Sequence, residues 1–402
     1  MSSYKHSLSL TSQLFFCSIP LRLDSYNRCQ FGCAFCFAKS RGGNVTKPEA
    51  ESASTTAFSA RLERVKDGII KSALDEMIEQ RIPIQLGGMT DPFSPWEASK
   101  GITKTILQVA NKHNYPIVFS TKGTLIGDPE YLGLVKDGNY YVRISMTGAE
   151  PKLAASLEKG VSSIEERLAL ITKLAKSDIN VSVRLQPIIP TQEPHISSLI
   201  QRIASAGAKH ISVEYLKWPI EKNSNQSNAL DKIMPDGKAF YVRNGATRSG
   251  REYVLPAKYK LPHLRELKDI AEKCGLVFGY ADNEFLHLNN FKSCCNAADL
   301  FLKNANFFEA NLLGAIKNRS PQNKITLNSI TTKWFPKNSI NPYLNSTMRT
   351  NVQIQDSGDW QNIIATKWNS DTWRGGPNSF YGVEDTSELD LNGNKIYSLS
   401  TD

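Results

Sequence analysis

The alternation of strand-like runs with helix-like stretches between residues 19 and 215 limits the fold class more than any other feature. Strands separated by helices run parallel and need crossover connections, because no hairpin turn joins one strand to the next. We therefore predict an α/β fold, a partial (β/α)6 barrel of the TIM type, with its chemistry on the loops that leave the C-terminal ends of the strands. The six predicted strands are Ile19–Leu23, Ile82–Leu86, Pro116–Ser120, Tyr140–Ser145, Val181–Gln186 and His210–Tyr215.

Two of the stretches between these strands have apolar residues three and four positions apart, the spacing of an amphipathic helix. Their apolar positions are Leu62, Val65, Ile69, Ala73 and Met77 in one, and Ile164, Leu168, Ile171 and Leu174 in the other. We predict one helix for each. Ser162 and Ser163 can cap the second helix, and a carboxylate three residues further on can complete a capping box.

The regular pattern ends after Tyr215. We predict a β-hairpin in residues 238–260 from its turn residues, then a helix at 261–274 and a strand at 276–280. The last hundred residues are rich in Asn, Ser and isolated Trp. The chain is thus expected to consist of a barrel (1–216), a C-terminal addition with a hairpin and a cysteine pair (217–302), and an irregular extension (303–402).

Cysteine content and hydropathy indicate the cellular setting. Seven cysteines in 402 residues are too few for a secreted scaffold held together by disulfides, and an odd number cannot all be paired within one chain. No run of 18 uncharged apolar residues is present, so no membrane span is expected. The apolar run Leu14–Pro20 could be a signal-peptide core, but its brevity favours a buried first strand. A cytoplasmic location is expected.

A loop after the first predicted strand carries three thiols, Cys29, Cys33 and Cys36, in the spacing C-x3-C-x2-C. Thiolates are soft ligands that suit zinc or an iron-sulfur cluster, and Gly32 lets the backbone curl so that the sulfurs converge. A structural zinc site would need a fourth ligand close by. The next histidine is His113 and the next cysteine is Cys274, which leaves a coordination position open for a substrate or cofactor.

With an aromatic residue, Phe35, before the third cysteine, this loop resembles the C-x3-C-x-Φ-C signature of the radical S-adenosylmethionine (radical SAM) superfamily. The resemblance implies a [4Fe-4S] cluster held by the three cysteines, with SAM bound to the fourth iron. It also implies an external one-electron reductant of the flavodoxin or ferredoxin type, and a 5′-deoxyadenosyl radical that abstracts a substrate hydrogen. Phe35 would pack beside the adenine, or serve only as a core aromatic.

Three further strings resemble the spore photoproduct lyase-like branch of this superfamily, often called DNA repair photolyase-like. They are T-D-P-F-S-P-W-E at 90–97, L-E-K-G-V-S-S-I-E-E-R-L at 157–168 and R-L-Q-P-I-I-P at 184–190. The resemblance implies a lyase-like or modifying enzyme acting on a nucleic acid base. Spore photoproduct lyases use a cysteine shortly after the cluster loop, but none lies between Cys36 and Cys274, so the spore lesion itself is not expected as substrate.

The resemblance also implies a set of SAM-binding residues. A glycine pair matches the G-G-E segment after the second strand, although Met89 replaces the glutamate. The lysine would pair with the SAM carboxylate, and the serine and arginine would approach the ribose or carboxylate. Each polar residue alone could equally be an ordinary strand-end group. The implied residues are Gly87, Gly88, Thr90, Lys122, Ser145 and Arg184.

The remaining cysteines leave two interpretations open. Cys294 or Cys295 could be a thiol hydrogen donor or a ligand of a second cluster, and both could be plain buried cysteines. Cys17 and Cys274 are interpreted as structural.

The net charge of +9 is concentrated in residues 238–260, which hold six basic residues against one acid. Phe240, Tyr241, Tyr253 and Tyr259 are interleaved with them. Basic groups can meet phosphates and aromatics can stack on bases, so the segment is a candidate nucleic-acid surface; the alternative is an exposed hairpin with solvated charges. Its basic residues are Lys238, Arg243, Arg248, Arg251, Lys258 and Lys260.

The favoured function is therefore a radical SAM enzyme acting on a nucleic acid base. A radical SAM enzyme for a nucleotide, peptide or small metabolite is the first alternative. A non-catalytic metal-binding module that docks on nucleic acid is the second.

Overall fold

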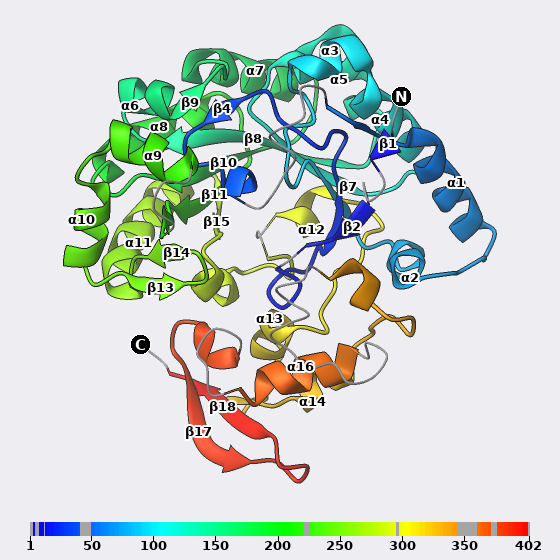
Figure 1. The fold of residues 1–402 in the computed structure, drawn as a ribbon, viewed down its shortest axis with the longest axis vertical. Coiled ribbons are helices and arrows are strands. Elements are labelled where there is room, and N and C mark those ends of the chain that lie inside the picture. The colour runs from blue at the N-terminus through cyan, green and yellow to red at the C-terminus, as the bar shows by residue number, and fades with distance from the viewer. Residues whose placement is uncertain are drawn as a thin grey trace.

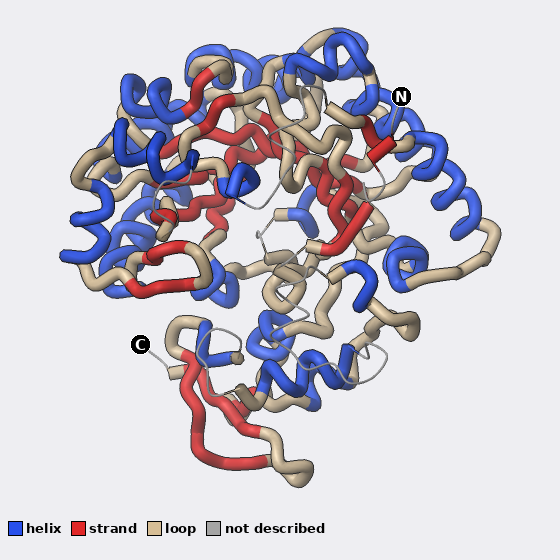
Figure 2. Tube along the Cα trace, viewed as in Figure 1, coloured by secondary structure: helices blue, strands red, loops and turns tan. Residues whose placement is uncertain are grey.

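The computed structural model describes residues 3–4, 8–11, 13–40, 50–220, 225–294, 297–344, 360–370 and 376–400. Its centre is a curved eight-stranded sheet with helices on its outer side (Figures 1 and 2). The strands, in spatial order, are β15 (Val277–Tyr280), β11 (His210–Tyr215), β10 (Val181–Ile188), β8 (Tyr140–Gly148), β7 (Ile117–Thr121), β6 (Ile84–Leu86), β3 (Leu21–Leu23) and β2 (Leu8–Leu10).

All six predicted strands are present, as β3, β6, β7, β8, β10 and β11, and they run parallel in chain order. The predicted strand at 276–280 joins them as β15, also parallel, while β2 pairs antiparallel with β3 at the other edge. The two edge strands do not pair with each other in the described part of the chain, so the barrel is partial and open.

The helices lie outside the sheet because alternate residues of the strands form an apolar face that the helices cover. On β8, Val142, Ile144 and Met146 share the main core with Ile171 and Leu174. The helices of this layer are α1 (Thr55–Lys66), α2 (Ala73–Glu79), α3 (Pro95–Lys100), α4 (Ile102–Lys112), α5 (Pro129–Lys136), α6 (Pro151–Leu157), α7 (Ile164–Lys176), α8 (Glu193–Ser205) and α11 (Ala257–Lys273).

The opposite, inner face of the sheet is covered near the start of its strands by the short helix α12 (Ala298–Phe301), which lies inside the curve (Figure 1). A small second core there joins Val118 of β7 and Tyr141 of β8 to Ala297 and Ala298. The rings of Tyr141 and Phe301 lie 5.2 Å apart. The C-terminal addition therefore covers the inner face at the N-terminal end of the strands.

The single helix predicted from Leu62 to Met77 is wrong. The chain forms two helices, α1 and α2, because Gly68 adopts a φ of +76° that an L-residue rarely takes, and Ile69 is 49% exposed. The other predicted helix is confirmed as α7, and it begins with a capping box between Ser163 and Glu166.

The hairpin predicted for residues 238–260 is also wrong in extent. Residues Gly237–Arg243 form α10, and the hairpin is confined to β13 (Thr247–Ser249) and β14 (Glu252–Val254), with β12 (Trp218–Pro219) as a third strand. The predicted helix at 261–274 is confirmed as α11, which begins at Ala257. Another helix, α9 (Asn225–Ile233), precedes α10.

The predicted irregular extension carries more regular structure than its composition indicates. A three-stranded antiparallel sheet orders β16 (Lys324–Ile325), β18 (Lys395–Leu399) and β17 (Val383–Leu389). It is accompanied by α13 (Leu312–Lys317), α14 (Asn328–Thr331) and α16 (Trp360–Trp368). Its apolar residues belong to the same core as the barrel, so the extension packs on the barrel.

The remaining described strands are β1 (Ser3–Tyr4), β5 (Ser52–Ala53), β4 (Gly32–Cys33) and β9 (Glu158–Lys159), and a 3-10 turn covers Phe37–Ser40. None of the described helices has the length and apolar character needed to cross a membrane.

Candidate functional site

The three-cysteine loop lies between β3 and the turn at Phe37–Ser40. Cys33 is buried, whereas Cys29 and Cys36 are partly buried. Burial, together with the charge of Asp91 and to a smaller extent Cys36, raises the pKa of the Cys29 thiol to about 12. Asp91 and Cys36 are therefore ionisable neighbours of Cys29.

A short antiparallel ladder fixes the loop to a distant part of the chain. In it β4 pairs with β9, so that Cys33 lies opposite Glu158 and Gly32 opposite Lys159. The Ala34 amide extends the ladder by donating to the Leu157 carbonyl at 2.8 Å. A side chain at Gly32 would meet the Lys159 Cβ at 3.0 Å, which explains the glycine at this close approach.

The three cysteines of the loop are the donor set that the sequence offers for an iron-sulfur cluster. No group of three or more His, Cys, Asp or Glu side chains within the described ranges is arranged to hold one metal ion. Three thiols on one loop, with no fourth Cys or His beside them in sequence, suit such a cluster.

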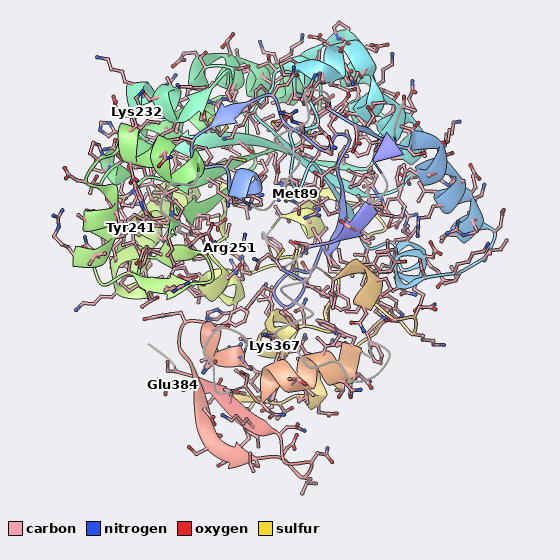
Figure 3. The ribbon with its side chains drawn as sticks, in the orientation of Figure 1. Met89, Lys232, Tyr241, Arg251, Lys367 and Glu384 are labelled. Carbon is pink, nitrogen blue, oxygen red and sulfur yellow. The ribbon has the colours of Figure 1, made fainter. Side chains whose placement is uncertain are left out.

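The glycine pair after β6 lies against this chain's own atoms. Gly87 has a φ of +80°, and a Cβ on Gly88 would come within 2.1 Å of the Arg22 side chain. The next two amides, of Met89 and Thr90, donate to the Asp24 carboxylate at 2.7 and 3.2 Å. The segment is thus held against the end of β3, next to the cysteine loop, and Figure 3 shows Met89 towards the middle of the molecule.

Asp91 connects the end of β6 to the end of β7. Its carboxylate accepts hydrogen bonds from the Phe93 amide at 2.9 Å, the Thr121 hydroxyl at 2.7 Å and the Lys122 amide at 2.7 Å. Burial raises its pKa in spite of these bonds. Asp91 therefore joins two strand ends beside Cys29, and the next helix, α3, begins only at Pro95.

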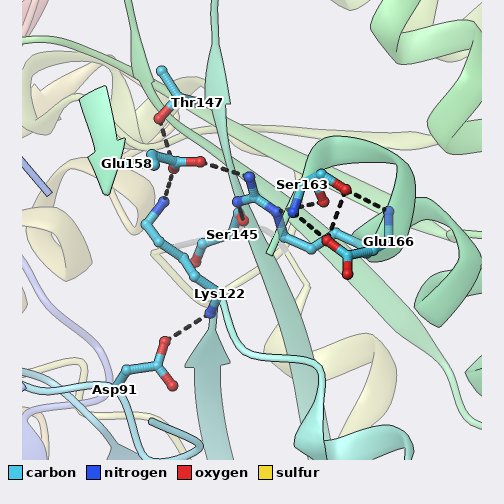
Figure 4. Close-up of polar contacts among 8 residues, drawn as sticks. Asp91, Lys122, Ser145, Thr147, Glu158, Ser163 and Glu166 are labelled. Atoms are coloured by element: carbon cyan, nitrogen blue, oxygen red, sulfur yellow. Dashed lines mark hydrogen bonds and ion pairs between the residues drawn. The ribbon is translucent and has the colours of Figure 1, made fainter. Parts of the chain in front are cut away.

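Lys122 lies in a buried ion network (Figure 4). Its ammonium donates to Glu158 at 2.5 Å and lies 5.3 Å from the centre of the Phe35 ring. The other Glu158 oxygen accepts from Arg167 at 2.5 Å, and Thr147 donates to Glu158 at 2.7 Å. The lysine predicted to meet the SAM carboxylate is therefore held by a carboxylate of this chain.

The two cations control the charge of Glu158. Burial alone would raise its pKa, but Lys122 and Arg167 lower it to about 2. Glu158 is 4% exposed and Arg167 is 2% exposed, so both charges are removed from water and depend on each other. Arg167 also donates to the Ser145 carbonyl at 2.6 Å, which links the network to the end of β8.

Ser145 and Arg184 lie side by side, because they are partners in the pairing of β8 with β10. Arg184 reaches Glu214 of β11 at 3.9 Å, and Gln186 and Lys217 also bind that carboxylate. Burial lowers the pKa of Lys217, but the Glu214 charge outweighs it, so that the pKa is raised. The register brings Lys122, Ser145 and Arg184 to the carboxyl ends of neighbouring strands. Their contact with a cofactor stays a prediction.

Sequence reasoning missed four residues of this site: Asp24, Asp91 as a strand-end link, Glu158 and Arg167. Two of them, Glu158 and Arg167, belong to the string at 157–168, which carried only a family resemblance. Their place in that string was the available signal, because the sequence does not show that the two side chains are buried.

Glu97, at the end of the string at 90–97, has a structural role. Its carboxylate accepts from the Tyr26 hydroxyl at 2.5 Å, the Tyr131 hydroxyl at 2.8 Å and the Thr103 and Lys104 amides at 2.8 and 2.9 Å. It thereby caps α4 and ties the helix to the loop that follows β3.

The structure places Cys294 next to Cys17, with 3.7 Å between the two sulfurs. Cys17 packs against the core of Val118 and Tyr141, at the start of the strands rather than at their ends. Cys274 ends α11. Cys295 lies outside the described residues, and a hydrogen-donor role for either member of the pair stays a prediction.

The basic segment 238–260 is only partly available to a partner. Lys260 is fully buried and binds Asp282 at 2.8 Å and Glu284. Tyr241 is 1% exposed and donates its hydroxyl to Leu216. The residues that remain exposed are Arg243, Arg248, Arg251 and Lys258, and Figure 3 marks Arg251 at the β13–β14 hairpin.

Comparison with known proteins gives one family match. Residues 23–203 match the family model described as the radical SAM superfamily. An uncharacterized protein of Mycobacterium tuberculosis is 25% identical over 206 residues, which are 49% of this chain and 59% of that protein. Radical SAM Nalpha-GlyT isomerase of Pseudomonas phage M6 is 24% identical over 199 residues, 47% of this chain and 38% of that enzyme.

Solved structures are similar at low sequence identity. A spore photoproduct lyase complexed with dinucleoside spore photoproduct has a TM-score of 0.49 at 15% identity, over 69% of this chain and 80% of that chain. SuiB of Streptococcus suis, bound to S-adenosylmethionine, has a TM-score of 0.38 at 14% identity, over 57% and 49%.

Proposed function

We propose that the protein cleaves SAM reductively and uses the product radical to abstract a hydrogen from a nucleic acid base, because residues 23–203 match the family model of the radical SAM superfamily. The observation that carries the proposal is the attachment of the three-cysteine loop to the carboxyl edge of the sheet through Asp91 and Glu158. Cys29, Cys33 and Cys36 would hold a [4Fe-4S] cluster. Such a cluster, when bound, supplies the electron that breaks the sulfur–carbon bond of SAM.

The residues of the site bind and orient the cofactor. Lys122 presents a cation beside Phe35, and Glu158 holds that cation in place. The glycine pair and the Asp24-bound amides set the shape of the neighbouring loop. A zwitterion that carries an adenosyl group needs a few such polar groups in a mostly apolar site. An external one-electron reductant of the flavodoxin or ferredoxin type would supply the electron.

The cleavage activity is tested on the full chain, purified and reconstituted without oxygen. After dithionite reduction in the presence of SAM, the protein should release 5′-deoxyadenosine. A reconstituted and reduced sample with a full complement of iron that releases none would contradict the enzymatic proposal. It would favour a non-catalytic metal-binding module.

The nucleic-acid part of the proposal rests on the family resemblance and on the exposed cations Arg243, Arg248 and Arg251. Binding that depends on phosphate contacts weakens steeply with salt. DNA affinity measured from low to moderate salt should fall with a slope that becomes shallower when all three arginines are changed to alanine. Wild-type binding that is undetectable at low salt would instead support a nucleotide, peptide or small metabolite as substrate.

A further inference from the structure

Arg143 of β8 is a buried cation with no counterion in the described part of the chain. It is 5% exposed, and its Nε and Nη2 atoms are buried without a hydrogen-bond partner. Its described contact is the face of the Tyr141 ring, whose centre lies 5.5 Å from the guanidinium carbon.

Other buried cations in the described ranges have carboxylate partners. Arg167 binds Glu158, and Lys260 binds Asp282 and Glu284. Two carboxylates at the carboxyl ends of the strands are engaged with other cations: Glu158 with Lys122 and Arg167, and Glu214 with Arg184 and Lys217. A buried charge without a partner is costly, so a binding role explains Arg143 better than a structural one.

A second unpartnered polar group lies beside Arg143. Ser120 of β7 is its direct partner in the β7–β8 pairing, so both side chains are on the same face of the sheet. The Ser120 hydroxyl oxygen is also buried without a hydrogen-bond partner. A guanidinium and a hydroxyl on neighbouring strands suit the oxygens of an anion.

The position of this pair along the strands relates it to the proposed active site. Two residues further along the same face come Lys122 and Ser145, which are the proposed SAM-binding residues. Two residues back come Val118 and Tyr141, which the α12 segment covers. Along the inner face of the sheet, Arg143 and Ser120 thus lie between the proposed cofactor site and the end that the α12 segment covers.

We propose that Arg143 and Ser120 bind an oxyanion of the substrate, a phosphate or a carboxylate. The proposal rests on the proposed function, because it treats Lys122 and Ser145 as residues that bind the cofactor. Since the α12 segment covers the neighbouring residues Val118 and Tyr141, the oxyanion is a terminal group of the substrate rather than an internal phosphate of a duplex. The substrate class is therefore a small anionic molecule, or the end of a chain, whose hydrogen is abstracted close to that group.

The test is calorimetric titration of the reconstituted full chain with SAM present, using inorganic phosphate and acetate as probes at fixed ionic strength. One of the two should bind, and the stronger one identifies the oxyanion. Arg143→Gln should weaken that binding tenfold or more, and Ser120→Ala threefold or more. Arg202→Gln, which changes a largely exposed arginine paired with Glu165, should bind as the wild type does.

Thermal melting separates binding from structure. Arg143→Gln removes an uncompensated buried charge, so its melting temperature should equal or exceed that of the wild type, whereas Arg167→Gln should melt lower. The inference is overturned if neither probe binds the wild type, if Arg143→Gln binds equally well, or if Arg143→Gln melts several degrees lower or fails to fold. SAM cleavage by the wild type is measured separately and tests the proposed function. If the wild type cleaves SAM but Arg143→Gln binds the probes as tightly as the wild type does, only the present inference is rejected.

Discussion

Glu158 is the residue at which the cysteine loop, the end of β7 and the start of α7 meet. Replacing it with glutamine would leave Lys122 and Arg167 without their shared charge. We expect Glu158→Gln to lower the free energy of unfolding by about 3–5 kcal/mol. Urea denaturation at neutral pH measures this, with Glu165→Gln as a control because that exposed glutamate lies on α7 and should change stability by less than about 0.5 kcal/mol.

The contribution of Glu158 depends on pH in a direction fixed by its pKa. The pKa falls from the ordinary value of 4.5 to about 2, so the folded state favours the charged form. The stabilisation, roughly 3 kcal/mol, is complete above pH 4.5 and is lost as the pH falls towards 2. The difference between wild type and Glu158→Gln should therefore shrink on acidification from pH 6 to pH 3. A difference that stays constant over this range would contradict the assignment.

Replacing one of the three loop cysteines should affect the iron content of the protein, whereas replacing another cysteine should not. Cys36→Ala should lose the visible absorption and most of the iron of the reconstituted protein, because one cluster ligand is missing. Cys274→Ala, at the end of α11, is the matched control and should retain both. Equal iron content in the two variants would argue against a cluster in this loop.

At the scale of elements, α4 and the loop after β3 depend on one carboxylate. Glu97→Gln would replace an acceptor for four donors by a group with one acceptor oxygen, leaving buried donors unsatisfied. We expect a loss of roughly 1–3 kcal/mol of unfolding free energy. Glu130→Gln is the control, because Glu130 binds Lys104 at the surface and should matter little.

The strands could be predicted because each one is a short segment with apolar residues at alternate positions at least, which is the pattern typical of a strand. The α1–α2 break was missed because apolar spacing continues across Gly68, and only its backbone conformation ends the helix. The prediction of a hairpin over residues 238–260 was wrong for a related reason. Residues 238–243 carry the charges of an exposed strand, yet they form a helix in which Tyr241 is buried. Lys260 cannot be recognised as buried without knowing that Asp282 and Glu284 reach it.

The candidate site also contains residues that could be predicted from the sequence and residues that could not. Its cysteines and strand-end residues are visible in sequence because they follow predicted strands. Glu158, Arg167 and Arg143 were not, since their roles depend on pairings between segments far apart in the chain. Burial of a charge is a tertiary property, and no local pattern reports it.

At the scale of the whole molecule, Trp360 joins the extension to the N-terminal part of the barrel. It is 2% exposed, stacks on Phe15 at 5.2 Å and donates its indole N–H to the Ala310 carbonyl at 2.6 Å. Trp360→Ala should cost about 3–5 kcal/mol. Trp334→Ala, at a residue that is 38% exposed, should cost far less.

The extension and the barrel share one core, so they should unfold together. Urea curves followed by tryptophan fluorescence and by far-ultraviolet circular dichroism should coincide for the wild type. Two separated transitions would show that the extension is an independent unit.

The β4–β9 ladder also sets an order of events during synthesis. Cys33 leaves the ribosome long before Glu158, its partner in the ladder, because 125 residues separate them. At ordinary elongation rates of about 5–20 residues per second, this interval lasts roughly 6–25 s. Until it ends, the nascent chain presents its three thiols on an unanchored loop, so iron delivered before then meets a site without its final shape.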